Sequence, residues 1–329
     1  MAAAERSGAA ALTKIGLLSL CGWLMVEWVA PARAQEHSGH RQPMPGGFTV
    51  TELKPGVFLH AGQQVALTAP GHDDIANIGF IVGEHCVAVI DTGGSVTIGR
   101  ALRAAIEKRT RLPICYIINT HVHVDHVLGN AAFKQDHPSF VGSAQLVAAI
   151  ARSTDFFLAQ YGGDLDAPPT ADQIISPDQG VERELTLDLG HRRLILESWP
   201  IAHTDCDLTV YDQRTGTLWT GDLLFRERLP AVDGSVKGWL SVIDELEHRQ
   251  VALIIPGHGT IAHDLATALK PERRYLRGLI DGVRQEIKGG QSMQHALEHV
   301  ANQESPHWLL WDSVHQRNVA RVYQELEWE

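Results

Sequence analysis

Basic residues are scarce in this chain of 329 residues. It contains 28 lysines and arginines against 39 aspartates and glutamates, which gives a formal net charge of -11 at pH 7. So acidic a chain lacks the positive surface on which nucleic-acid binding depends. No basic amphipathic stripe of the kind that binds membranes is visible either. We therefore expect a small-molecule substrate as the partner and no nucleic acid.

Long hydrophobic runs are also lacking. The apolar run over residues 15–26 is much shorter than the roughly 20 residues that cross a bilayer. Basic residues precede this run and Ala32-Arg33-Ala34 follows it, which is the pattern of a cleaved secretory signal. We therefore expect a Sec-type signal peptide over residues 1–34, cleavage after Ala34, export to the periplasm and no membrane span in the mature chain. A lipoprotein site at Cys21 is the less favoured alternative.

No linker rich in proline, glycine or serine divides the chain after Gly47. Residues 35–47 are polar and contain several breakers, which is typical of a flexible spacer. A role in scavenging metal is the alternative for its two histidines. Residues 48–329 are then expected to form one domain with a helical C-terminal part, close to the upper size limit for a single core.

Cysteines are few, and three lie in the expected mature chain: Cys86, Cys115 and Cys206. An odd number in an exported protein leaves at least one thiol free or intermolecular. Cys86 and Cys115 begin strands that we expect to be neighbours. A bridge between them is conceivable, but unpaired thiols are the favoured interpretation.

Histidines, in contrast, are abundant, and three of the 18 lie in His121-Val122-His123-Val124-Asp125-His126. This stretch follows the β-branched run Ile114–Ile118, which predicts a buried strand. If the backbone turns after His123, the two halves of the motif can face two adjacent centres. Imidazole nitrogens and carboxylate oxygens are the ligands that zinc prefers in catalytic sites. A solvated loop that happens to be rich in histidine is the alternative.

Three more potential ligands follow short apolar runs, as the first cluster does. They are His203 in Pro200-Ile201-Ala202-His203-Thr204, Asp222 in Thr220-Gly221-Asp222-Leu223, and His258 in Pro256-Gly257-His258-Gly259. Strand ends are where α/β folds usually meet their substrates. The repeated setting therefore favours one shared metal site.

From Asp91-Thr92-Gly93 to Pro256-Gly257-His258-Gly259, these motifs resemble in order and spacing the metallo-β-lactamase superfamily of zinc hydrolases. The resemblance implies an α/β fold, a four-layer αββα sandwich of two mixed sheets with the metals at one edge. It also implies two zinc ions per chain and assigns their ligands. The first ion would be held by His121, His123 and His203, the second by Asp125, His126 and His258, and Asp222 would bridge them.

All seven ligand positions are filled as in the two-metal hydrolase branch that includes glyoxalase II, whereas the β-lactamase branches typically carry cysteine or serine in place of Asp222. Asp125 is the candidate catalytic residue among them. Asp205-Cys206-Asp207 departs from the Pro-Gly turn that the superfamily commonly has there. This departure affects the local geometry more than the ligand set.

Further site candidates lie outside the ligand set. A βαβ unit is predicted by the apolar run Val87–Ile90, the helical spacing after it and the apolar run Ile114–Ile118. This unit places Asp91 beside the cluster. There it would orient a ligand imidazole, because ligating histidines usually donate their second N–H to a carboxylate or carbonyl; capping the turn is the alternative. By the resemblance, His72 and Asp73 are in a hairpin loop that overhangs the metals and touches substrate.

Residues 225–240 combine fixed charges, breakers and Trp239, which suggests a substrate-facing loop. Packing of Trp239 on the core is the alternative. The amino-acid sequence of this segment resembles that of a narrower group, the quinoprotein relay system zinc metallohydrolases. That resemblance implies a functional link to a quinoprotein dehydrogenase of an exported compartment and names no substrate.

The expected function is hydrolysis of an ester, thioester or amide/lactam bond by a hydroxide that bridges two zinc ions. No Ser-His-Asp arrangement or phosphate-binding glycine loop competes with it. One alternative is an iron enzyme resembling the persulfide dioxygenases, with His121, His203 and Asp222 on a single iron. The other is a non-catalytic metal-binding accessory protein of a periplasmic dehydrogenase.

Overall fold

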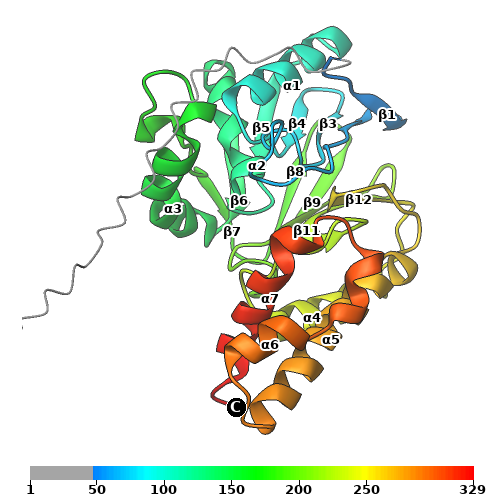
Figure 1. Ribbon diagram of the computed structural model, residues 1–329. Coiled ribbons are helices and arrows are strands. Elements are labelled where there is room, and N and C mark those ends of the chain that lie inside the picture. The colour runs from blue at the N-terminus through cyan, green and yellow to red at the C-terminus, as the bar shows by residue number, and fades with distance from the viewer. Residues whose placement is uncertain (1–46) are drawn as a thin grey trace, which may run out of the picture. The chain divides into compact units, whose positions relative to one another are not determined.

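Two mixed β-sheets form the centre of the protein in the computed structural model, which describes residues 47–329 (Figure 1). The predicted signal peptide and all but the last residue of the predicted spacer lie outside this range. Among residues 47–329, no helix combines the length and apolar character needed to cross a membrane.

The first sheet has seven strands in the order β1-β2-β3-β4-β5-β6-β7. Its strands are β1 (Thr51–Lys54), β2 (Val57–His60), β3 (Ile78–Val82), β4 (Val87–Ile90), β5 (Ile114–Ile118), β6 (Ser139–Ser143) and β7 (Gln179–Val181). Neighbours from β1 to β4 are antiparallel, and those from β4 to β7 are parallel. The parallel half consists of crossover units, as the βαβ pattern predicted.

The second sheet has five strands in the order β12-β11-β10-β9-β8. Its strands are β8 (Glu184–Asp188), β9 (Arg193–Ser198), β10 (Leu208–Asp212), β11 (Thr217–Phe225) and β12 (Leu253–His258). Only β11 and β12 pair in parallel. These two strands therefore end at the same edge of the sheet.

The two sheets pack face to face through one apolar cluster, in which Ile90 and Ile118 of the first sheet meet Leu196 and Trp219 of the second. Helices cover the outer faces: α1 and α3 pack on the first sheet, and α4, α5, α6 and α7 pack on the side of the second. The helices are α1 (Val96–Arg109), α2 (Val124–Val127), α3 (Leu146–Tyr161), α4 (Val236–Leu246), α5 (Leu265–Lys288), α6 (Met293–His299) and α7 (Trp311–Leu326). The predicted αββα sandwich is confirmed.

A disulfide joins Cys86 and Cys115, whose Cα atoms lie 5.8 Å apart. The prediction of unpaired thiols is therefore wrong at these two positions. The bridge links the starts of β4 and β5, which are adjacent parallel strands. Cys206 is free and buried, and packs in the core of the first sheet and its helices.

A buried ion pair ties the sheets together at the end remote from the histidines. Arg192 donates to both carboxylate oxygens of Asp212, at 3.1 and 2.5 Å. Its remaining nitrogen donates to the carbonyls of Pro55 and Val82 in the first sheet, at 3.0 and 2.8 Å. The guanidinium thereby satisfies acceptors from both layers.

Candidate metal centre

The candidate ligands lie at the ends of strands along one edge of the sandwich. His121 lies three residues after β5, and His123 is the residue immediately before α2. Asp222 lies near the end of β11, and His258 is the last residue of β12. Because the ends of β5, β11 and β12 meet at this edge, residues from positions 121 to 258 converge on one buried region.

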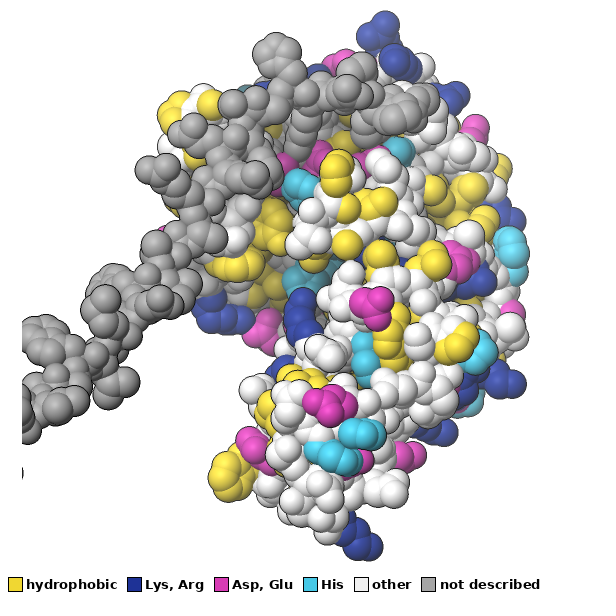
Figure 2. Space-filling view, in the orientation of Figure 1, with side chains coloured by type: hydrophobic (Ala, Val, Ile, Leu, Met, Phe, Trp, Pro, Cys, Tyr) yellow, Lys and Arg dark blue, Asp and Glu magenta, His cyan; other side chains and the backbone are white. Residues whose placement is uncertain are grey.

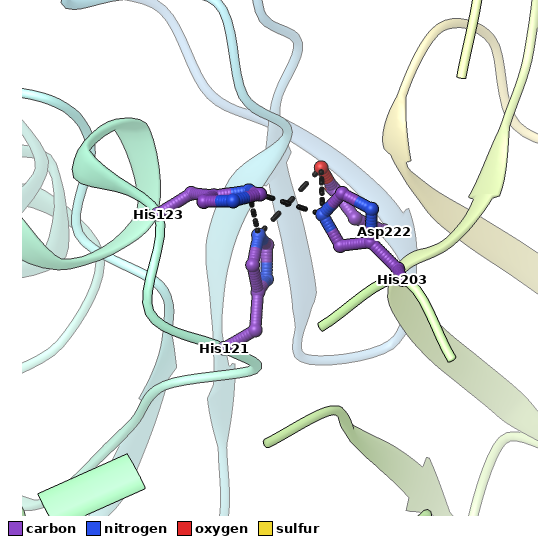
Figure 3. Close-up of side chains that lie close together, drawn as sticks. All are labelled: His121, His123, His203 and Asp222. Carbon is purple, nitrogen blue, oxygen red and sulfur yellow. Dashed lines mark hydrogen bonds and ion pairs between the residues drawn. The ribbon is translucent and has the colours of Figure 1, made fainter. Parts of the chain in front are cut away.

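The first group contains His121, His123, His203 and Asp222, whose donor atoms all lie within 4.8 Å of one another (Figure 3). Nδ1 of His123 is 3.0 Å from Nε2 of both other histidines. The Asp222 Oδ2 atom is 3.6 Å from Nε2 of His121 and 3.4 Å from Nε2 of His203. Four atoms with lone pairs thus converge on one point.

The second group contains Asp125, His126 and His258. Asp125 Oδ2 is 3.4 Å from Nε2 of His126 and 3.3 Å from Nε2 of His258. Asp222 also faces this group: its Oδ1 is 3.3 Å from His126 Nε2, and its Oδ2 is 3.3 Å from His258 Nε2. The structure therefore places the Asp222 carboxylate between the two groups.

The second nitrogen of each of these imidazoles has an acceptor of its own. Nδ1 of His203 lies 2.7 Å from the carbonyl oxygen of Ala231, and Nδ1 of His258 lies 2.8 Å from that of Ile75. Since a carbonyl can only accept, Nδ1 of His203 must carry the proton. Nδ1 of His258 also lies 3.2 Å from the Arg228 guanidinium, which can only donate, but the shorter contact with the Ile75 carbonyl assigns the proton to this Nδ1 as well. The tautomer is thus fixed, and the Nε2 lone pair is directed into the cluster.

Asp91 fixes two more rings. Its Oδ2 accepts from Nδ1 of His126 at 2.8 Å and from the hydroxyl of Thr120 at 2.7 Å, and its Oδ1 accepts from the Thr120 backbone N–H. The Thr120 oxygen in turn lies 3.0 Å from Nδ1 of His121 and can accept its proton. One carboxylate therefore orients a histidine of each group, and its own φ of 52° is the strained conformation that this position demands.

Asp233 orients His123 and was missed by the sequence analysis. Its Oδ2 lies 2.8 Å from Nε2 of His123, which leaves Nδ1 for the centre. Arg317 on α7 forms an ion pair with the other oxygen of Asp233. Burial opposes ionisation, but the bonds to His123 and Arg317 outweigh it and hold the pKa of Asp233 well below its usual range. Its position in the polar segment 225–240 was the only sequence signal.

The donor set fits a metal. His126 Nε2 and Asp222 Oδ1 are buried and have no hydrogen-bond partner in the described residues, an arrangement that is costly unless another group satisfies them. Burial lowers the pKa of His203 to about 4 and also lowers that of His121. Both rings are therefore neutral at pH 7, which is the form that binds a cation.

His72 and Asp73 lie away from the cavity above this cluster. His72 Nε2 is 2.9 Å from Asp164, and the Asp73 carboxylate accepts from the hydroxyl of Ser95, at the start of α1. The residues of their loop that line the cavity are Ala66, Leu67, Thr68 and Ile75. The loop lines the cavity through residues on either side of His72 and Asp73, and not through these two.

Trp239 is fully buried in α4, not part of a substrate-facing loop. Its indole N–H donates to the carbonyl of Leu223, and its ring lies edge-on to His203 with centroids 5.2 Å apart. The expectation of a substrate contact is wrong, and the alternative of core packing is right. Trp239 supports the His203 ring from behind.

A cavity of about 780 Å³ opens over the two groups and is lined by His123, Asp125, Asp222 and His258 among others. Arg228 also lines it. This arginine is buried, its NH1 lies 3.2 Å from Nδ1 of His258, and no carboxylate of residues 47–329 forms an ion pair with it. Burial lowers the pKa of Arg228, while Asp125 and Asp222 raise it. The guanidinium is thus a fixed positive charge on the cavity wall.

Comparisons with known proteins agree with this geometry. The family model of the metallo-beta-lactamase superfamily matches residues 72–258, whereas no curated protein matches the chain. A metallo-beta-lactamase from Pontibacter korlensis has a TM-score of 0.57 and 19% sequence identity, over 70% of this chain and 99% of that one. An inverting sec-alkylsulfatase from Pseudomonas sp. has a TM-score of 0.61 and 17% identity, over 85% of this chain and 50% of that one. The chain therefore spans about half the length of the alkylsulfatase.

Proposed function

The chain belongs to the metallo-beta-lactamase superfamily, and from its site we infer that it is a dinuclear zinc hydrolase of an ester, thioester or amide/lactam bond. The observation that carries this proposal is the position of Asp222, whose two oxygens face both groups of donors. A site for a single metal would not require the second, complete group of Asp125, His126 and His258.

In this proposal His121, His123 and His203 would hold one zinc ion, Asp125, His126 and His258 would hold the other, and the Asp222 carboxylate would be available to both. The bound ions would supply a hydroxide nucleophile at neutral pH and Lewis-acid stabilisation of the developing negative charge. The chain's own residues fix the tautomers and the ring orientations through Asp91, Asp233 and two backbone carbonyls. Arg228 adds a positive charge on the wall of the cavity.

Asp125 is the proposed catalytic residue because it is the carboxylate of the second group that lines the cavity and therefore meets substrate. Burial opposes its ionisation, but His126 and His258 hold the pKa of Asp125 well below its usual range. It is consequently ionised across the physiological range and can accept a hydrogen bond from the group that attacks or leaves.

We further propose that the enzyme is exported to the periplasm and is functionally linked to a quinoprotein dehydrogenase. The signal pattern over residues 1–34 supports export, and the amino-acid sequence of residues 225–240 supports the link to a quinoprotein dehydrogenase. Sequencing the amino terminus of the purified protein tests the first idea: Gln35 is expected, and a lipidated Cys21 would contradict it. Assay of the dehydrogenase in cells that lack this protein tests the second, and unchanged dehydrogenase activity would contradict it.

Metal analysis and one substitution test the central proposal. Protein prepared without chelator should contain close to two zinc ions per chain, and Asp222→Ala should lose metal and nearly all hydrolysis of activated esters, thioesters and lactams. Asp281→Ala, on the exposed face of α5, is the matched control and should behave as wild type.

Two outcomes would overturn the proposal. Active protein with one iron and no zinc would favour the dioxygenase chemistry. Full zinc occupancy without turnover of any substrate in the panel would favour the accessory role.

A further inference from the structure

Exposed hydrophobic side chains gather at the mouth of the cavity. Six large hydrophobic residues are exposed within residues 47–329, and three of them line this one cavity: Leu67, Phe156 and Ile201, which are 38%, 56% and 47% exposed. Single exposed hydrophobic residues are ordinary on protein surfaces, but a cluster at a concave site marks a ligand surface. Figure 2 shows hydrophobic side chains beside the hollow in this face.

These residues come from separate parts of the chain. Leu67 belongs to the loop between β2 and β3, Phe156 to α3, and Ile201 to the segment between β9 and β10. On the α7 side, Leu310 and Val314 complete the wall. Four segments thus each place an apolar side chain around the same opening, which a chance distribution over the surface would not produce.

The apolar lining continues from the mouth down to the candidate ligands. Val122 lies between His121 and His123 in the chain and lines the cavity. Phe225 also lines it, and its ring centroid lies 5.4 Å from that of His203 and 5.1 Å from that of His258. A chain of methylenes that entered at the mouth would therefore remain on apolar surface as far as the donor groups.

The charged groups at the mouth already have partners. Arg152 forms an ion pair with Asp205, and Arg317 forms one with Asp233. Arg228, which has no carboxylate partner among the described residues, is instead buried beside His258. Fixed charge is thus available to the substrate near the candidate metals, whereas the mouth offers mainly apolar contacts.

We propose that the preferred substrates are amphiphilic, with the bond to be hydrolysed beside the metals and a long, uncharged acyl or alkyl chain against Leu67, Phe156, Ile201 and Val314. This inference rests on the proposed hydrolase function and names its substrate class. A cavity of about 780 Å³ is within the roughly 300–1,000 Å³ of pockets that enclose small ligands. The dimensions therefore suit a small molecule and not a protein partner.

A homologous series of p-nitrophenyl esters, from acetate to decanoate, tests the proposal with the zinc-loaded protein. Burial of a methylene is worth up to about fourfold in kcat/KM, so kcat/KM should rise with chain length until the apolar wall is covered. Phe156→Ser should lower the decanoate-to-acetate ratio of kcat/KM at least severalfold. Val147→Ser is the matched control, because Val147 is exposed on the same helix but does not line the cavity.

Three results separate the possible failures. If kcat/KM is flat or falls with chain length, or if both serine variants have the same ratio, the apolar-substrate proposal is wrong although the hydrolase proposal stands. If none of the esters, thioesters and lactams is hydrolysed, the hydrolase proposal fails, and binding of the neutral dye N-phenyl-1-naphthylamine, weakened by Phe156→Ser but not by Val147→Ser, still supports the apolar site. If light scattering shows that Phe156→Ser dissociates a dimer without changing the ester ratio, the patch contacts a second copy and the proposal is overturned.

Discussion

Removal of the Asp233 carboxylate should weaken the first metal site selectively. Among residues 47–329, Asp233 is the one acceptor for Nε2 of His123, at 2.8 Å. In the Asp233→Ala variant the ring can rotate and change tautomer, so that Nδ1 is no longer held as a free lone pair toward His121 and His203. Loss of such an outer partner typically costs 10- to 100-fold in metal affinity.

The structure narrows this range. The hydrogen bond from His123 to the Asp233 carboxylate is charge-assisted, and hydrogen bonds to charged groups contribute roughly 1.5–3 kcal/mol. However, the side chains of His123 and Asp233 are both about a quarter exposed, at 28%, and water can replace part of the interaction. We therefore expect a loss of about 30-fold at one of two sites, which is close to 2 kcal/mol.

Competition titration against a chromogenic zinc chelator measures both affinities. Asp233→Asn should lose less than Asp233→Ala, because the amide oxygen can still accept from Nε2. Asp205→Ala is the matched control: Asp205 also lies at the cavity mouth in an ion pair with an arginine, but within residues 47–329 it forms no ion pair with a histidine. Wild-type affinity at both sites of Asp233→Ala, or an equal loss in Asp205→Ala, would refute the reasoning.

Two further predictions concern stability. Arg192→Met leaves Asp212 buried without its partner, and breaking a buried pair in this way costs about 3–5 kcal/mol; urea unfolding should show this loss, and a change below 1 kcal/mol would contradict it. Burial of Glu272 raises its pKa well above the usual value, and only one of its oxygens accepts a hydrogen bond, from the N–H of Phe225. Because the folded state prefers the protonated acid, wild type should lose stability relative to Glu272→Gln as the pH rises above about 4.5. The loss should be about 1.4 kcal/mol for each pH unit by which folding raises the pKa of Glu272. The prediction is wrong if the difference in free energy of unfolding between wild type and Glu272→Gln stays constant from pH 5 to pH 8.

The convergence of the candidate ligands could be predicted because each follows an apolar run that ends at the same edge of the sandwich. The hydrogen-bond acceptors behind the rings could not be predicted in the same way. Ala231 and Ile75 act through backbone carbonyls, which no residue type reveals. Asp233 carries a side chain that could have been suspected, but only the path of the loop between β11 and α4 brings it to His123.

The interpretation of Trp239 failed for a reason that the sequence itself contains. Val236, Trp239, Ile243 and Leu246 recur at helical spacing and are all buried on one face of α4. The charged residues, glycines and proline nearby obscured this helical spacing. The disulfide is a different case, because its formation depends on the register of β4 against β5, and strand patterns alone do not fix a register between parallel neighbours.

The C-terminal helix α7 has a larger part in the site than the extent of the family match suggests, since that match ends at residue 258. Asn318 accepts from the N–H of Val232 and donates to the carbonyl of Pro230, and Arg321 donates to the carbonyls of Asp233 and Gly234. These bonds hold the segment from which the Ala231 carbonyl reaches His203 and the Asp233 carboxylate reaches His123. Two of the three histidines of the first group therefore take their orientation from a loop that α7 holds in place, so the geometry of the metal centre depends on residues about 60 positions beyond the last ligand.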